Sequence, residues 1–309
     1  MESVTVAVLS AAVTVGTPIL YATLGELFAE RAGVLNLGVE GMMLVGAVSG
    51  FMATVHTGNH WLGILVAMAA GCLVALIHAF LTVSLGVNQV VSGLALTIFG
   101  TGLSGYLGKD MVGIPSPSPF SSLNLGFLSH IPYIGQILFQ HDAMVYLTYL
   151  LVPLCWYFLN HTASGLDLRA AGENPGATDA AGLDVGRIRY AAVIFGGAMA
   201  GVGGAYLSLV YAPAWLESMT AGRGWIAVAL VIFAIWDPFR AMLGAYLFGG
   251  IEALGFRLQA IGITMSPFVL SMLPYLFTII ALILITYGSR KNHVGAPAAL
   301  GLAYEREER

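Results

Sequence analysis

The sequence predicts an all-α polytopic membrane protein, a single domain over residues 1–309 with about nine transmembrane helices (eight to ten), some of them broken or re-entrant. Hydrophobic residues make up 58% of the chain and charged residues only 9%, against roughly 25% charged in an ordinary soluble domain. Apolar runs of about 20 residues, each long enough to cross the hydrocarbon core as a helix, recur along the whole chain. The 39 glycines favour helices that pack backbone against backbone in lipid.

The predicted spans follow these apolar runs in order. They lie at about 3–25, 34–55, 61–84, 88–107, 141–160, 188–211, 224–236, 239–258 and 268–287. The seventh span is short, Pro18 and Pro274 fall inside others, and Pro267 directly precedes the last, which indicates one or two broken or re-entrant helices. The stretch Phe195 to Leu209 places small residues on two adjacent helix faces, so we expect two neighbouring helices to approach it closely.

The basic residues predict an N-out, C-in orientation, because Lys and Arg concentrate in cytoplasmic loops. With the N-terminus outside, the cytoplasmic side collects Arg31, Arg169, Arg187, Arg189, Arg240, Arg290, Lys291, Arg306 and Arg309, and the outer side retains Lys109, Arg223 and Arg257. The last residues, 288–309, then form a cytoplasmic tail.

Two connections are long. The extracytoplasmic one, about 108–140, begins with the Pro- and Ser-rich sequence GIPSPSPFSSLNLGF, and it is either a platform for an outside partner or a solvated connector. The cytoplasmic one, about 161–187, predicts a short helix outside the membrane. Asn174 can cap this helix, Pro175 suits its first position, and Gly182 can end it in the left-handed conformation.

Several polar residues lie at membrane depth. If the second span is a regular helix, Glu40 lies roughly 13 Å from Arg31 along its axis, with Asn36 one turn away on the same face. A carboxylate there either locks two helices together or lines a translocation pathway. A second carboxylate, Glu252, lies near Arg257 in the eighth span. The candidate pathway or gate residues are Asn36, Glu40, Asn88, Gln89, Ser92 and Glu252.

No catalytic group and no metal site is predicted. The chain has no G-x-x-x-x-G-K-[ST] sequence with which to hold a nucleotide phosphate, so any ATP is expected to bind another subunit.

Four separated blocks carry a family resemblance. They read GELFAERAGVLNLGVEGMMLVGA, GVNQVVSGLAL, LRAAGENPGATDAAGLDVGRIRYAAVIFGGAMAGVGGAYLSL and MTAGRGWIAVALVIFAIWDPFRAMLGAYLFGGIEALGF. Together they resemble the permease subunits of ABC importers of the branched-chain amino acid and simple-sugar superfamily, most closely the nucleoside permeases. The resemblance implies a non-catalytic, multi-pass subunit of the bacterial inner membrane with no cofactor of its own.

The resemblance also implies partners. These are ABC ATPase subunits that bind ATP and Mg, a second identical or homologous permease subunit, an extracytoplasmic substrate-binding protein and a small-molecule substrate, with no nucleic acid. The cytoplasmic loop is then a coupling loop that contacts the ATPase. Its implied coupling residues are Arg169, Gly172, Glu173, Asn174, Pro175, Ala177 and Gly182.

The predicted cargo is a nucleoside or a related heterocycle, and a simple sugar, a branched-chain amino acid or a flavin are the alternatives. Sugar-type relatives carry an Asp-Leu-Ser-type sequence where this chain has Asn36-Leu37-Gly38, which favours nucleosides. A different class, a proton-coupled secondary transporter, would use Glu40 and Glu252 as a proton relay.

Overall fold

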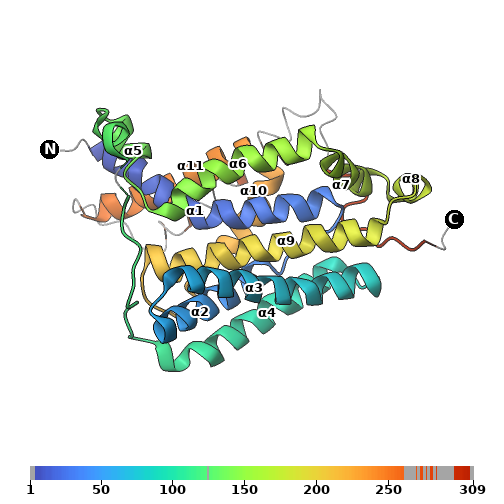
Figure 1. Cartoon of the computed structure of the whole chain (residues 1–309), viewed down its shortest axis with the longest axis horizontal. Coiled ribbons are helices and arrows are strands. Elements are labelled where there is room, and N and C mark those ends of the chain that lie inside the picture. Colours follow the sequence, from blue (N-terminus) through green and yellow to red (C-terminus); the bar gives the residue numbers. More distant parts are fainter. Residues whose placement is uncertain are drawn as a thin grey trace.

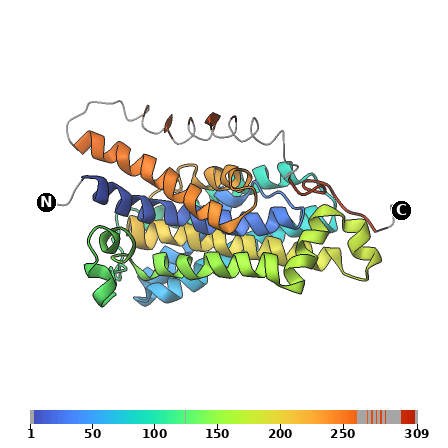
Figure 2. The ribbon, with the colours of Figure 1, turned by 90° about the horizontal axis from the view of Figure 1, so that it is seen from above.

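The computed structural model describes residues 4–123, 125–260 and 296–306, and seven positions between them. Those positions are Val269, Met272, Leu273, Leu276, Ile279, Ile280 and Ile283. Within these residues the chain forms a bundle of helices whose long members run side by side, with the N-terminus at one end and the C-terminus at the other (Figure 1). Viewed from above, the short helices α7 and α8 lie at the same end as the C-terminus (Figure 2).

Seven helices in the described part of the chain are long and apolar enough to cross a membrane. They are α1 (Val4–Arg31), α2 (Val39–Thr57), α3 (His60–Ala79) with a π-helical end (Phe80–Ser84), α4 (Gln89–Gly108) with a 3₁₀ end (Lys109–Met111), α6 (Ala143–His161), α9 (Val185–Tyr206) with a π-helical end (Leu207–Tyr211), and α11 (Pro238–Ala260). The shorter elements are a 3₁₀ helix (Gly126–His130), α5 (Ile134–Leu138), α7 (Ala163–Glu173), α8 (Pro175–Ala180) and α10 (Arg223–Phe233).

The predicted helical, multi-span class is confirmed. The first eight predicted spans coincide with the seven long helices and α10. With 11 residues, α10 is about 17 Å long and too short to cross the membrane alone. The ninth predicted span, about 268–287, lies outside the described residues except for the seven positions named above. The total number of spans and the N-out orientation therefore stay predictions.

Helix α9 is the centre of the bundle. In its most apolar stretch 83% of the residues are buried inside the protein, against 28% for α4 at the periphery. Three helices bring a glycine against a glycine of α9: Gly25 of α1 against Gly196, Gly71 of α3 against Gly197, and Gly46 of α2 against Gly201. The predicted close approach is confirmed, with three neighbouring helices rather than two.

The second span differs from its prediction at its start. Helix α2 begins only at Val39, and the residues between it and α1, which we call connection 32–38, are non-helical and mostly buried. Asn36 therefore does not lie one helical turn from Glu40, and that expectation is wrong. The physical reason is that side chains of other helices bond the backbone of this connection in place of a helical ladder, as described below.

The glycine contacts predict which glycines tolerate a methyl group. A Cβ on Gly46 would lie 2.5 Å from the Cα of Gly201, whereas a Cβ on Gly102 meets nothing within 4 Å. We expect Gly46→Ala to separate α2 from α9 and to lower the free energy of unfolding by roughly 1–3 kcal/mol. Gly102→Ala is the matched control, and it should leave stability unchanged or raise it by up to about 1 kcal/mol. Thermal unfolding in detergent measures both, and equal melting temperatures would contradict the packing argument.

Candidate functional site

Connection 32–38 is irregular backbone inside a membrane-spanning bundle. In hydrocarbon such backbone persists only where protein groups satisfy its amides and carbonyls. The Leu35 amide donates to Gln89 Oε1 at 2.7 Å, and the Asn36 amide donates to Glu26 Oε1 at 2.8 Å. The Gly38 amide donates to the side chain of Asn36 at 2.9 Å. Side chains of α1 and α4, and one within the connection, thus accept from amides that a helix would otherwise bond.

The carbonyls of the connection are bonded in the same way. Arg189 of α9 donates to the Ala32 carbonyl at 3.2 Å, and Thr97 of α4 donates to the Leu37 carbonyl at 2.8 Å. A carbonyl cannot donate, so His78 Nε2, which lies 3.2 Å from the Leu35 carbonyl, carries the proton of that bond. In the neutral imidazole His78 Nδ1 then accepts from Ser92, 2.9 Å away. Four helices therefore hold one short connection.

The structure brings three of the predicted pathway residues together. Asn36, Gln89 and Ser92 are buried at connection 32–38, where each bonds backbone or a side chain that bonds backbone. Asn88 lies apart: it is exposed, and its side chain caps α4 by accepting from the Val91 amide at 3.1 Å. Their role in a substrate pathway stays a prediction.

Glu40 faces the start of α10. Its Oε1 accepts from the Thr220 hydroxyl at 2.5 Å and from the Gly222 amide at 2.9 Å, and its Oε2 accepts from the Gly224 amide at 2.6 Å. Helix α10 has no side-chain cap of its own, because Gly222 occupies the capping position. Glu40 of α2 is thus the cap of a short helix distant in sequence, and its carboxylate lies at the positive end of the α10 dipole.

The loop before α10 is shaped to present these donors. Ser218, Ala221 and Gly222 all have positive φ, of 54°, 48° and 84°, and the first two are strained for residues with a side chain. Gly224 lies so close to α2 that a Cβ on it would be 2.5 Å from the Cα of Glu40. The backbone of this loop therefore meets Glu40 at a distance that only glycine permits.

Arg223 connects the same loop to α11. Its Nη2 donates to Glu252 Oε1 at 2.5 Å, its Nη1 donates to the carbonyls of Met219 and Thr220, and its guanidinium lies over the ring of Tyr211. Arg223 was predicted to be one of the charges on the outer side, but only 8% of it is exposed. Glu40 and Glu252 thus belong to one network, defined by Glu40, Thr220, Gly222, Arg223, Gly224 and Glu252.

The sequence did not reveal several residues that bond the two non-helical segments, connection 32–38 and the loop before α10. Arg223 as the partner of Glu252 was not foreseen, although the sequence MTAGRGW ahead of a short span was a signal of a backbone that leaves the helix. Glu26 and Glu30 were missed because the first span was predicted to end near residue 25. In the structure α1 continues to Arg31, and both glutamates are buried, Glu30 accepting from the indole of Trp236 at 2.7 Å.

The cytoplasmic loop contains the predicted short helix. Asn174 caps α8 by accepting from the Ala177 amide at 2.9 Å, Pro175 takes the first helical position, and Gly182 follows with φ of 88°. These three features are confirmed. The structure adds α7, which was not predicted and which Thr162 caps by accepting from the Gly165 amide at 3.0 Å.

The implied coupling residues have three different environments. Glu173, Asn174, Ala177 and Gly182 are exposed on the loop, where a partner can reach them. Gly172 is buried, because its Cα lies against the backbone of Arg31 and Gly33 at the end of α1. The loop and connection 32–38 are therefore in direct backbone contact at this end of the bundle. Arg169 and Pro175 are half-buried.

The Glu40 contacts predict an outcome for two substitutions. Glu40→Gln keeps one acceptor oxygen but turns an NH₂ donor toward at least one N–H or O–H donor, so we expect a loss of roughly 1–3 kcal/mol in the free energy of unfolding. Glu40→Leu leaves three donors unpaired and should be worse. Glu217→Gln, an exposed carboxylate of the same loop, is the control. If all three variants unfold at the wild-type temperature in detergent, Glu40 does not hold α10.

Comparison with known proteins gives relatives of similar length. A putative glucose ABC transporter permease of Haloferax volcanii is 44% identical over 97% of both chains. A nucleoside ABC transporter permease of Lactococcus lactis is 36% identical over 87% of this chain and 88% of the relative. A guanosine ABC transporter permease of Bacillus subtilis is 32% identical over 98% of this chain and 97% of the relative. No solved structure matches.

The family model described as the permease component of branched-chain amino acid transport systems matches residues 8–286. This match covers the long helices, connection 32–38 and the network around Glu40, and it accords with a multi-pass membrane protein. Permeases of this kind are non-catalytic, and ATP is hydrolysed by a separate ATPase. The chain therefore belongs to the branched-chain amino acid and simple-sugar family of ABC transporter permeases.

Proposed function

We propose that this permease is the membrane subunit of an ATP-driven importer for nucleosides, and that α8 transmits the movement of the ATPase. The observation that carries the second part is the position of α8: a capped helix on a loop whose residue Gly172 touches the end of α1. In this proposal the α8 end of the bundle is cytoplasmic, ATP and Mg bind the ATPase, and the opposite loop, about 108–140, faces a substrate-binding protein.

The contacts supply a route for the movement. A displacement of α8 moves α7, and Gly172 at the end of α7 lies against Gly33 in connection 32–38. The connection leads directly into α2, whose first turn holds Glu40 against the start of α10. Since packed helices switch between discrete arrangements rather than deform continuously, this route would rotate α2 and α10 together. Access to a path between two permease subunits would change sides as a result.

The network around Glu40 would hold α2, α10 and α11 in position along this path and would not transfer protons. Within the described residues Glu40 accepts from one hydroxyl and two backbone amides, and Glu252 is paired with Arg223. A relay needs groups that exchange protons, so these fixed bonds favour an ABC importer over a proton-coupled carrier. In proteoliposomes with the ATPase, vanadate should stop uptake and a protonophore should not.

The short α8 predicts a sharp effect of proline. Thr178 donates its amide to the Asn174 carbonyl at 3.1 Å, so Thr178→Pro removes the first helical bond and costs about 3 kcal/mol or more. The variant should insert, because no span is changed, yet fail to copurify with the ATPase or fail to couple hydrolysis to uptake. Thr178→Ala keeps the amide and is the control. Wild-type uptake by Thr178→Pro would move the coupling role elsewhere, first to the turn at Asp237 and Arg240.

The cargo has two candidates. The relatives named for nucleosides and guanosine, and Asn36-Leu37-Gly38, support a nucleoside. The 44% identity to a putative glucose permease supports a simple sugar as the second candidate. Uptake of labelled guanosine should be competed by unlabelled nucleosides and not by a hundredfold excess of glucose. Uptake of labelled glucose that guanosine does not compete would overturn the first candidate in favour of the second.

A further inference from the structure

The C-terminal residues fold back onto the α8 end of the bundle. Residues 297–306, which we call the C-terminal strap, cross the coupling loop and then connection 32–38. The Ala299 amide donates to the Gly172 carbonyl at 2.9 Å, and the Gly301 amide donates to the Gly33 carbonyl at 3.3 Å. Ala299 itself is buried, with 5% of its surface exposed. The strap is therefore bonded through its backbone to both sides of the contact between Gly172 and Gly33.

Two buried side chains hold the strap and connection 32–38 at the same time. Arg189 donates to the Ala32 carbonyl at 3.2 Å and to the Leu302 carbonyl at 3.0 Å. Gln89 accepts from the Leu35 amide at 2.7 Å and donates to the same Leu302 carbonyl at 3.5 Å. The Leu302 carbonyl of the strap thus accepts from Arg189 of α9 and from Gln89 of α4, and both side chains also bond connection 32–38.

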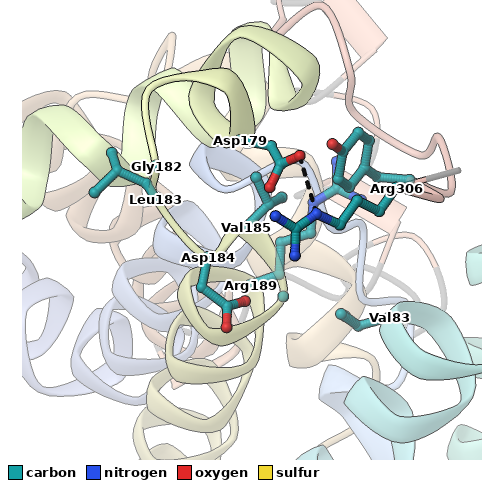
Figure 3. Close-up of a pocket in the computed structure, with 10 residues that line it drawn as sticks. Val83, Asp179, Gly182, Leu183, Asp184, Val185, Arg189 and Arg306 are labelled. Carbon is teal, nitrogen blue, oxygen red and sulfur yellow. Dashed lines mark ion pairs between the residues drawn. The ribbon is translucent and has the colours of Figure 1, made fainter. Parts of the chain in front are cut away.

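The strap also reaches the coupling helix. The Ala298 amide donates to Glu173 at the end of α7 at 3.2 Å, and Arg306 pairs with Asp179 of α8 at 3.4 Å. Figure 3 shows this ion pair across a cavity of about 320 Å³ between the α8–α9 turn, α9 and the end of the strap. The cavity lies beside the contact between the strap and α8, so the ion pair spans its edge rather than a packed core.

We propose that the C-terminal strap positions the coupling loop: it ties α7 and α8 to connection 32–38, so that movement of α8 reaches the transmembrane helices instead of bending the loop. This role rests on the proposed function of α8. Without the strap, α7 keeps its packing against α1, α6 and α9, but the loop loses its bonds to the strap and, through the strap, its link to Arg189, Gln89 and connection 32–38. A larger part of the movement of α8 would then be absorbed within the loop before it reaches α2.

The test measures the ATP hydrolysed per substrate transported by the complete transporter in proteoliposomes. Ala299→Pro removes the amide that bonds Gly172, and Ala299→Gly keeps this amide and is the control. We expect Ala299→Pro to copurify with the ATPase within about twofold of wild type and to raise the ratio at least about tenfold, the effect of one lost buried bond. If uptake falls only in proportion to the folded complex and the ratio is unchanged, the strap is a structural support and the proposal is wrong.

The ion pair between the exposed Arg306 and the largely buried Asp179 provides a second test, because the two charges can be exchanged. Arg306→Asp places two carboxylates together and should raise the ratio at least about twofold, the lower end expected because one side of the pair is exposed. The double variant Arg306→Asp with Asp179→Arg should return it to the wild-type value. An unchanged ratio in the single variant, or no recovery in the double variant, would overturn the proposal.

Thr178→Pro, assayed in parallel, separates this proposal from the proposed function. If Thr178→Pro loses uptake while Ala299→Pro and Arg306→Asp keep the wild-type ratio, α8 is the coupling element and only the strap is wrong. If Thr178→Pro transports normally, the role of α8 is wrong and the strap proposal falls with it.

Discussion

The need to bond every backbone amide and carbonyl within the hydrocarbon region determines how this chain can be built. Regular helices satisfy that need by themselves, but the chain leaves the helical ladder at connection 32–38 and again before α10. At each break, polar side chains of the helices supply the missing partners: Gln89, Glu26 and His78 at the first, Glu40 at the second. These polar residues of the spans therefore bond the backbone that the two breaks leave without helical partners.

The two breaks lie close to each other along α2. Connection 32–38 leads into its first turn, and the first turn carries Glu40, which caps α10. A change in the direction of α2 must therefore alter both breaks together. Because Arg223 of the second break is paired with Glu252, the same change extends to α11. A substitution in one of these elements should therefore not be additive with a substitution in another.

The glycines of α9 give the bundle a rigid centre around which these irregular segments are arranged. Gly196, Gly197 and Gly201 let α1, α3 and α2 approach the backbone of α9. The approach removes space into which a side chain could relax, so each contact has a defined position. Connection 32–38 is bonded by Arg189 of the same helix. The fixed centre and the broken segments are thus joined directly.

The sequence by itself determined the helical membrane class, eight of the helices and the capped helix α8, because hydropathy and capping depend on neighbouring residues alone. For that reason the roles of Asn174, Pro175 and Gly182 in α8 could be predicted. The sequence did not determine where α2 begins or which groups Glu40 bonds. Asn36 and Glu40 are four residues apart in a run that reads as one helix. Side chains far away in the sequence, such as Gln89 and Arg189, stabilise the non-helical path instead, and the loop at 220–224 bonds Glu40. Such partners are chosen by packing, so the tertiary structure alone decided them.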